Sequence, residues 1–314
     1  KWAKDLKWHP EFMKTRYDNW VEGLKWDWCI SRQIPFGIPF PVWYCKNPEC
    51  EKPIMANEED LPVDPVETSP PVDKCPSCGG EEFEPETDVM NTWATSALTP
   101  TIIKDLVKEK RNEAYEKIKD KPMDIRRNGQ DIITFWNFNT MVKSNLHFGY
   151  NPWKEAYING WMLGRDGRKM SKSKGNGIAP QEVIDEHGAD ALRYLSASIK
   201  PGSNAAFSDK ELILAKKLYT KLFNATKFVF MNLEDYNKKD KPEKLETTDK
   251  LFLKKLNDSI EKITKHFENY EPTLARGEFD RFFWNMFCDN YLEIVKKRVY
   301  NSQAGDNEKV SAQY

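Results

Sequence analysis

Two pairs of cysteines constrain the fold of this chain more than any other feature of its sequence. Cys45 and Cys50 are separated by four residues, Cys75 and Cys78 by two, and two glycines follow the second pair. Short thiolate pairs brought together by turns are typical of a structural zinc site. An acidic, proline-rich stretch lies between the pairs, and a bound metal would hold it in place. The pattern predicts a zinc knuckle over residues 43–85, with no coordination position left open for catalysis.

Two disulfides are the alternative use of these four cysteines. The N-terminus lacks the apolar core of a secretory signal, and disulfides are rare in reducing compartments. We therefore favour structural Zn²⁺ and a cytoplasmic location. The other two cysteines, Cys29 and Cys288, stand among aromatic residues, and we expect both thiols to be buried.

Length and charge exclude several classes of protein. With 314 residues the chain is long enough for about two domains. No apolar run approaches the roughly 18 residues of a membrane span, so we expect no membrane partner. Residues 51–88 carry twelve acidic and two basic side chains, whereas residues 165–227 carry twelve basic and seven acidic ones. A polyanion such as RNA is expected to approach the second stretch.

Local patterns divide the chain into a mixed α/β part and a helical part. Residues 123–138 indicate a polar loop that leads into a buried helix, and residues 155–163 a short buried strand. Residues 180–187 and 189–198 indicate two helices separated by the capping glycine Gly188. From about residue 210, apolar residues recur at helical spacing, which predicts a helical bundle. The apolar faces are expected to include Leu214, Leu218 and Leu222 in one helix, and Ile260 and Phe267 in another.

The run from Gly164 to Asn176 carries the chemistry. Three lysines at positions 169, 172 and 174 alternate with small and hydroxyl residues, and glycines flank them. A mobile loop that presents ammonium groups suits a polyphosphate whose charge shifts in a transition state.

The order of residues in this run points to a known family. Lys169-Met-Ser-Lys-Ser173 matches the KMSKS signature of class I aminoacyl-tRNA synthetases. The stretches 26–45, 88–100 and 129–136, with Asn159-Gly-Trp-Met-Leu163 before the signature, resemble valyl-tRNA synthetases, most closely those of archaeal type. Isoleucyl enzymes are the nearest alternative, but their counterpart of 88–100 would read closer to DVWFDSG.

The resemblance implies an α/β plus all-α fold: the second half of a Rossmann-like nucleotide-binding domain with a zinc knuckle, followed by an anticodon-binding bundle. The expected parts are a segment returning to the catalytic domain (1–42), the zinc knuckle (43–85), the second half of the nucleotide-binding domain (86–160), the KMSKS loop with connecting helices (161–209) and the truncated helical bundle (210–314).

The resemblance also implies a reaction and its residues. Valine would be activated with ATP and Mg²⁺ to valyl-adenylate and transferred to tRNA(Val). Lys169 and Lys172 would be catalytic, stabilising the β- and γ-phosphates. The residues implied to bind ATP or the adenylate are Gly129, Asp131, Asn159, Lys169, Met170, Ser171, Lys172 and Ser173.

An apolar pocket for the valine side chain is implied at Trp93 and Ile132, although both residues also suit an ordinary hydrophobic core. Two nearby positions depart from the family pattern. Asn91 stands where Asp is usual, and Gln130 where His or another residue is common.

The other signature of the class, His-x-Gly-His (HIGH), is absent from this sequence, because the four histidines at 9, 147, 187 and 266 do not form it. We therefore expect an internal piece of a longer synthetase, or one half of a split enzyme, inactive without a HIGH half in cis or in trans. The alternatives are a tRNA-binding remnant without catalysis and, far less favoured, a zinc-dependent scaffold protein.

Overall fold

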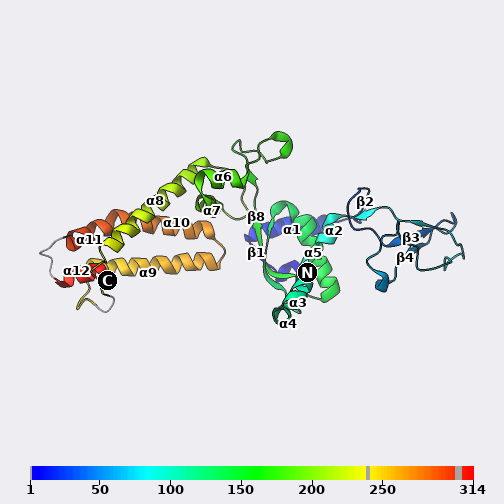
Figure 1. Ribbon diagram of the computed structural model, residues 1–314, viewed down its shortest axis with the longest axis horizontal. Helices are drawn as coiled ribbons and strands as arrows, with labels where there is room; N and C mark the ends of the chain where they lie inside the picture. The colour runs from blue at the N-terminus through cyan, green and yellow to red at the C-terminus, as the bar shows by residue number, and fades with distance from the viewer. Residues whose placement is uncertain (1, 238–240, 301–305) are drawn as a thin grey trace. The chain divides into compact units, whose positions relative to one another are not determined.

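The computed structural model describes residues 2–237, 241–300 and 306–314. The chain forms two compact units, Lys1–Ile158 and Asn159–Tyr314 (Figure 1). Within the described residues, none of the helices is long and apolar enough to cross a membrane.

A three-stranded sheet organises the first unit. Its strand order is β1 (Lys7–His9), β8 (Trp153–Asn159) and β7 (Met123–Gly129), and β1 runs parallel to β8 with Trp8 opposite Ala156. Helix α5 (Phe138–Phe148) connects β7 to β8. Ala156 and Ile158 of β8 are buried, as is Trp153 at its start, which stacks on Trp136 with ring centroids 5.3 Å apart.

The expectation of a polar loop at 123–129 is wrong, because these residues form strand β7. They lie at an edge of the described sheet, where polar side chains are tolerated. Arg126 does not extend into water. Its guanidinium lies 4.3 Å from the centroid of the Trp136 ring, so the Arg126 side chain covers this buried ring through a cation–π contact.

The other elements of this unit are short. The helices are α1 (Lys14–Gly23), α2 (Thr92–Ser96), α3 (Thr99–Lys110) and α4 (Asn112–Ile118), with 3₁₀ turns at Trp2–Asp5, Glu11–Met13, Glu58–Asp60 and Gln130–Ile132, and a π-helical turn at Ile133–Asn137. Strands β2 (Ser31–Arg32) and β6 (Val89–Met90) pair antiparallel.

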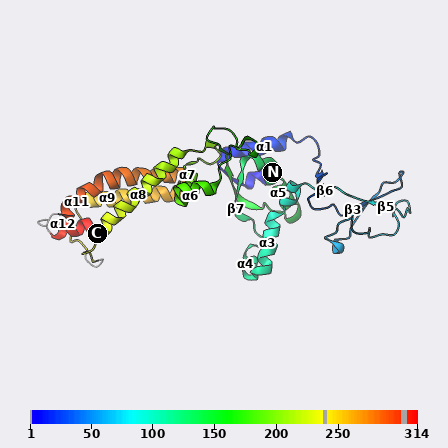
Figure 2. The same cartoon turned by 45° about the horizontal axis from the view of Figure 1, so that its top comes forward.

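The four paired cysteines belong to a separate small sheet. Strands β4 (Pro53–Met55), β3 (Val42–Cys45) and β5 (Phe83–Pro85) form an antiparallel sheet with β3 in the centre, and β3 and β5 are marked in Figure 2. Trp43 of β3 is buried, and its indole N–H is shared between the carbonyl oxygens of Pro65 and Thr68, each at 3.1 Å. This contact fastens the acidic loop to the sheet.

The second unit begins with a small sheet and continues as helices. Strands β9 (Met162–Leu163) and β10 (Ala205–Ala206) are parallel. The two expected helices are confirmed as α6 (Pro180–His187) and α7 (Ala189–Ser198), on either side of Gly188 with φ +88°. The remaining helices are α8 (Asp209–Met231), α9 (Thr247–Glu268), α10 (Pro272–Arg281), a π-helical segment (Phe282–Tyr291), α11 (Leu292–Val299) and α12 (Asp306–Gln313). The mixed α/β fold followed by a helical region is confirmed.

The expected core faces of these helices are partly wrong. Leu218 is buried, but Leu214 and Leu222 are exposed, as are Ile260 and Phe267. The buried line of α8 instead comprises Leu212, Ala215, Leu218 and Ala225. The small side chain of Ala215 lets α8 pack closely against α7. The larger leucines lie on the neighbouring face of α8, so the expectation that they face the core is wrong.

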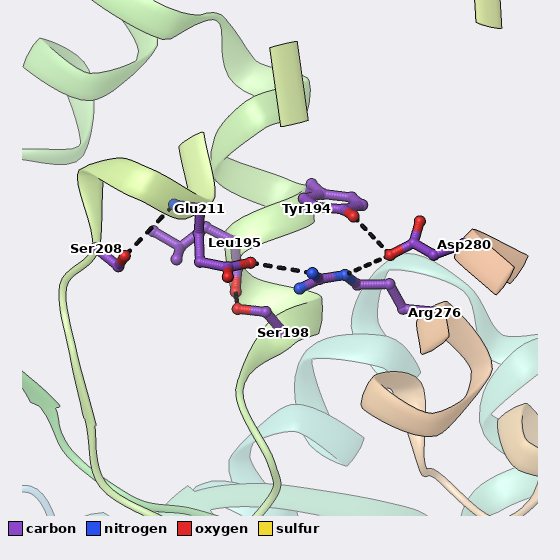
Figure 3. A network of polar contacts seen from close by, with 7 residues as sticks. All are labelled: Tyr194, Leu195, Ser198, Ser208, Glu211, Arg276 and Asp280. Atoms are coloured by element: carbon purple, nitrogen blue, oxygen red, sulfur yellow. Dashed lines mark hydrogen bonds and ion pairs between the residues drawn. The ribbon is translucent and has the colours of Figure 1, made fainter. Parts of the chain in front are cut away.

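A polar network ties α7, α8 and α10 together (Figure 3). The guanidinium of Arg276 lies 3.0 Å from Glu211 and 3.3 Å from Asp280 and covers the ring of Tyr194 at 4.0 Å. The Tyr194 hydroxyl donates to Asp280 at 2.7 Å. Burial, together with the nearby Asp280 carboxylate, raises the pKa of Tyr194 to about 12. Tyr194 therefore stays a neutral donor at physiological pH.

Candidate functional site

The lysine-rich run forms a hairpin that leads into a loop. Leu163 at the end of β9 pairs antiparallel with Lys169, and the amide of Gly164 donates to the carbonyl of Arg168 at 2.8 Å. Gly167 closes the turn at φ +72°, a conformation that favours glycine. The signature residues begin at the returning end of this hairpin and continue into a 3₁₀ turn at Lys172–Lys174.

Asn176 closes the loop onto the hairpin. Its side-chain oxygen accepts a hydrogen bond from the Ser171 amide at 3.0 Å, and its Nδ2 lies 3.4 Å from both Asp166 Oδ1 and the Lys169 carbonyl. Asp166 Oδ1 also accepts from the Arg168 amide at 3.0 Å, which with the Asn176 contact lowers the pKa of that carboxyl. One amide side chain thus contacts the first and third residues of the signature and the turn that precedes them.

The signature side chains occupy different environments. Lys169 is exposed, and its ammonium lies 4.2 Å from the centroid of the Trp161 ring. Met170 packs against the core of the second unit, and the hydroxyls of Ser171 and Ser173 are 3.3 Å apart. The side chain of Lys172 lies outside the described part of the structure. The half-buried Met170 side chain anchors the loop to this core, while Lys169 stays at the surface.

The predicted ribose-binding residues lie at the end of β7. Gly129 is the last residue of the strand, and Asp131 is exposed in the 3₁₀ turn that follows. A Cβ atom at Gly129 would lie 2.6 Å from Asp131 Oδ1, so the present position of the carboxylate requires glycine there. Between them, Gln130 is buried and its side-chain oxygen accepts from Arg16 of α1 at 2.8 Å.

The two residues predicted for the amino-acid pocket are both half-buried against the core of the first unit. Trp93 stacks on Phe135 at 6.4 Å between ring centroids, and Phe135 also contacts Trp20 and Trp28. Ile132 lies in the turn after Asp131. Because both side chains are only partly covered by the core, both keep apolar surface for a small ligand.

Asn91, one of the two departures, has a clear local role. Its side-chain oxygen accepts from the Trp93 amide at 2.8 Å and caps the N-terminus of α2. Asn and Asp are equally good caps. The amide therefore preserves the placement of Trp93 that a carboxylate would give. Asn159, another predicted adenylate residue, is the half-buried last residue of β8.

The structure brings the sulfur atoms of Cys45, Cys50, Cys75 and Cys78 within 4.8 Å of one another. Cys45 and Cys78 are 3.6 Å apart, and Cys50 and Cys75 are 3.7 Å apart. A tetrahedral zinc with Zn–S bonds of about 2.3 Å sets its sulfurs about 3.8 Å apart, whereas a disulfide needs about 2.05 Å. The four thiols are thus arranged as a metal site and not as two disulfides.

The glycines after Cys78 shape this site. The amide of Gly80 donates to Cys78 Sγ at 3.4 Å and, as the largest of several causes, lowers the pKa of that thiol to about 7. A Cβ at position 80 would stand 3.4 Å and 3.5 Å from the sulfurs of Cys78 and Cys45. A backbone donor to the sulfur suits a thiolate ligand.

The expectation for the two isolated cysteines is half wrong. Cys288 is buried, as expected, but Cys29 is exposed. A hydrogen bond with the Ser31 side chain lowers the pKa of Cys29. The surrounding aromatic residues gave the wrong signal, because Trp26 and Phe36 are themselves exposed.

Four residues of these sites were not predicted as site residues from the sequence: Arg16, Phe135, Trp161 and Asn176. Arg16 is distant in sequence from Gln130, and no local pattern reveals their contact. Trp161 and Asn176 lie on either side of the signature, and only the folded hairpin and loop bring the Trp161 ring to the Lys169 ammonium and the Asn176 side chain to the Lys169 carbonyl. Phe135 sits in an apolar run, where it is indistinguishable from a core residue.

Residues 1–208 match the family model of tRNA synthetases class I (I, L, M and V), and residues 249–314 that of the anticodon-binding domain of tRNA ligase. Curated relatives named valine–tRNA ligase include those of Picrophilus torridus, 44% identical over 94% of this chain and 37% of the relative, and Archaeoglobus fulgidus, 42% identical over 99% and 35%. That of Wolbachia is 42% identical over 99% of this chain and 36% of the relative. The chain spans about a third of the length of these relatives.

Solved structures agree on the fold. A Mycobacterium tuberculosis methionyl-tRNA synthetase in complex with methionyl-adenylate matches with a TM-score of 0.66 at 18% identity, covering 99% of this chain and 52% of that one. The LeuRS of Agrobacterium radiobacter K84, in a complex with tRNA and LeuAMS, matches with a TM-score of 0.62 at 22% identity, covering 92% and 38%. The clasped KMSKS loop and the matches over most of the chain lead to one conclusion: this chain belongs to the class I tRNA synthetases of the isoleucine, leucine, methionine and valine group.

Proposed function

We propose that this chain supplies the KMSKS part of a valine–tRNA ligase, which activates valine with ATP and transfers it to tRNA(Val). The observation that supports the proposal most is the loop between Lys169 and Asn176. The Asn176 side chain accepts a hydrogen bond from its backbone, Met170 packs half-buried against a hydrophobic core, and Lys169 at its start is exposed. A loop held in this way can offer fixed positive charge to a polyphosphate.

The proposed chemistry has two steps. A carboxylate oxygen of valine attacks the α-phosphorus of ATP, and pyrophosphate leaves with the bonding electron pair. A ribose hydroxyl of the tRNA terminus then attacks the carbonyl carbon of the adenylate and releases AMP. Lys169 and Lys172 neutralise the charge that builds up on the leaving phosphates, Met170, Ser171 and Ser173 shape their loop, and Mg²⁺ accompanies ATP.

Five further residues are proposed to bind the adenylate or the amino acid. The exposed carboxylate of Asp131 accepts the ribose hydroxyls, and Gly129 leaves room for it. Asn159 is proposed to lie near the adenine. Trp93 and Ile132 line the valine side-chain pocket, where an apolar wall excludes larger side chains but separates valine poorly from threonine.

Zn²⁺ is proposed at the four clustered cysteines, with a structural role. Four thiolate ligands close the coordination sphere, so the metal supplies folding energy to the small sheet and no catalytic water. Because charging of tRNA serves translation, we place the enzyme in the cytoplasm. The HIGH signature is proposed to come from another segment, in cis or in trans.

The proposal is tested by amino-acid-dependent ATP–pyrophosphate exchange with the complete gene product. Valine should stimulate exchange far more than isoleucine. Lys169→Met should lower the rate by about 10²- to 10³-fold, the typical effect of removing one preorganised electrostatic group. Lys110→Met, which removes an equally exposed charge in α3, is the matched control. Preferential stimulation by isoleucine would favour the isoleucyl alternative, and tRNA binding without any exchange would favour a non-catalytic remnant.

A further inference from the structure

Trp161 presents a fixed aromatic surface to the first lysine of the signature. Its amide donates to the side-chain oxygen of Asn204 at 2.9 Å, and its carbonyl accepts from the Ala205 amide at 3.0 Å. The preceding residue, Gly160, approaches the backbone of Ser203 so closely that a Cβ there would lie 2.0 Å from the Ser203 carbonyl oxygen. The backbone of Trp161 is therefore held on both sides.

Lys169 reaches this ring across the hairpin. The pairing of Leu163 with Lys169 sets Trp161, two residues before Leu163, on the same face and diagonal to the lysine. The ammonium lies 4.2 Å from the ring centroid, well within cation–π range. In the described residues, the structure gives the Lys169 ammonium no ion pair that would compete with this contact.

We propose that Trp161 is a positioning residue, which holds the Lys169 ammonium by a cation–π contact so that it meets the leaving phosphates of ATP. The proposal rests on the proposed function. A lysine is a point charge on a flexible four-carbon stem with three donors. The ring covers one side of the ammonium and restricts its rotamers, while the exposed side keeps its donors for phosphate oxygens. Preorganised charge of this kind lowers a barrier more than mobile charge does.

The kinetic test is a double-mutant cycle in the complete gene product, followed by valine-dependent ATP–pyrophosphate exchange. Trp161→Leu should lower kcat by about three- to thirtyfold, the range of a partly desolvated cation–π contact. Trp161→Phe should retain most of the rate, because it keeps an aromatic face. In a Lys169→Met background, Trp161→Leu should have almost no further effect.

A matched control is available in the same hairpin. Arg165 lies 5.0 Å from the centroid of the Phe207 ring and pairs with Asp209. In an Arg165→Met background, Trp161→Leu should lower kcat as much as in the wild type. A Trp161→Leu variant with wild-type kcat would overturn the proposal, as would a loss that persists in the Lys169→Met background.

A second measurement does not depend on catalysis. The ¹⁵N-labelled indole resonance of Trp161, identified by its absence in Trp161→Phe, should shift in Lys169→Met and stay in place in Lys174→Met. The indole of Trp43, which is hydrogen-bonded in the small sheet, is the internal reference. An unchanged resonance in Lys169→Met would overturn the contact. Failure of the wild type in exchange, with the resonance shift present, would instead refute the proposed function.

Discussion

The side-chain oxygen of Asn176 accepts a hydrogen bond from the backbone amide of Ser171 at 3.0 Å. The same side chain reaches the Asp166 carboxylate and the Lys169 carbonyl through its nitrogen. The loop that presents the signature lysines is thus closed by one residue five positions beyond Ser171. Together with the packing of Met170, this closure holds the shape of the loop.

Removing this closure should weaken catalysis while leaving the fold intact. Asn176→Ala loses the acceptor for the Ser171 amide, and each such hydrogen bond contributes about 1 kcal/mol. We expect a five- to tenfold fall in kcat/KM for ATP in pyrophosphate exchange, by the factor of ten per 1.4 kcal/mol. The melting temperature should change little, because the loop is at the surface.

Asp166→Asn is the control for this change. The amide keeps an oxygen that accepts from the Arg168 amide, so the turn should survive. Near-wild-type exchange in Asp166→Asn, together with a clear loss in Asn176→Ala, would support the role of the Asn176 hydrogen bonds in shaping the loop. Equal losses in both variants would show that the charge of Asp166, and not the hydrogen-bonded closure, matters.

The cap at α2 gives a second prediction. Asn91→Ala removes the acceptor for the Trp93 amide and should cost about 1 kcal/mol of unfolding free energy, whereas Asn91→Asp should be nearly neutral. Because the cap places Trp93, the KM for valine should rise in Asn91→Ala. Denaturant unfolding and exchange kinetics measure the two effects. A lower KM for valine in Asn91→Asp would mean that the family carboxylate does more than cap.

The third prediction concerns the clustered cysteines. The purified protein should contain one zinc per chain by elemental analysis, and Cys78→Ala should lose it. Chelation of the metal should unfold the sheet of β3, β4 and β5, while the sheet of β1, β7 and β8 persists. The unfolding should appear as faster hydrogen exchange of the Trp43 indole N–H. Cys29→Ser is the matched control and should keep its zinc. Zinc-free protein with a protected Trp43 would contradict a structural metal.

A buried ion pair in the helical unit gives the fourth prediction. Asp249 is buried, and its carboxylate accepts from Arg298 at 2.6 and 2.7 Å, from Ser311 at 2.6 Å and from Tyr291 at 3.0 Å. These groups join α9, α11 and α12. Arg298→Met should cost about 3–5 kcal/mol of unfolding free energy, since it leaves a buried charge without its partner. Arg281→Met, which removes the exposed partner of the half-buried Glu278, should cost far less.

The same pair should make stability depend on pH. Burial alone would raise the pKa of Asp249, but the hydrogen bonds from Arg298 and Ser311 outweigh it, and the pKa lies below its ordinary value. The unfolded carboxyl titrates near about 3.9. The stabilisation is therefore complete above about pH 4 and is lost as the pH falls through the lower, folded pKa. In Asp249→Asn the unfolding free energy should fall less steeply in this acid range, and an unchanged slope would contradict the assignment.

Local signals were enough to predict some of these features. The cysteine spacing predicted a cluster, because short-range turns determine it. Helices α6 and α7 followed from their own spacing around Gly188. Strand β7 and the exposure of Cys29 could not be predicted, since both depend on neighbours distant in the sequence. For the same reason, the contacts of Arg16 with Gln130 and of Trp161 with Lys169 became visible only in three dimensions.

Aminoacylation of a tRNA(Val) transcript by the complete gene product with labelled valine tests the proposed function most directly. We expect ATP-dependent accumulation of valyl-tRNA, little charging with isoleucine, and a loss of about 10²-fold or more in Lys169→Met. Binding of the transcript without ATP-dependent charging by valine would refute the proposed function.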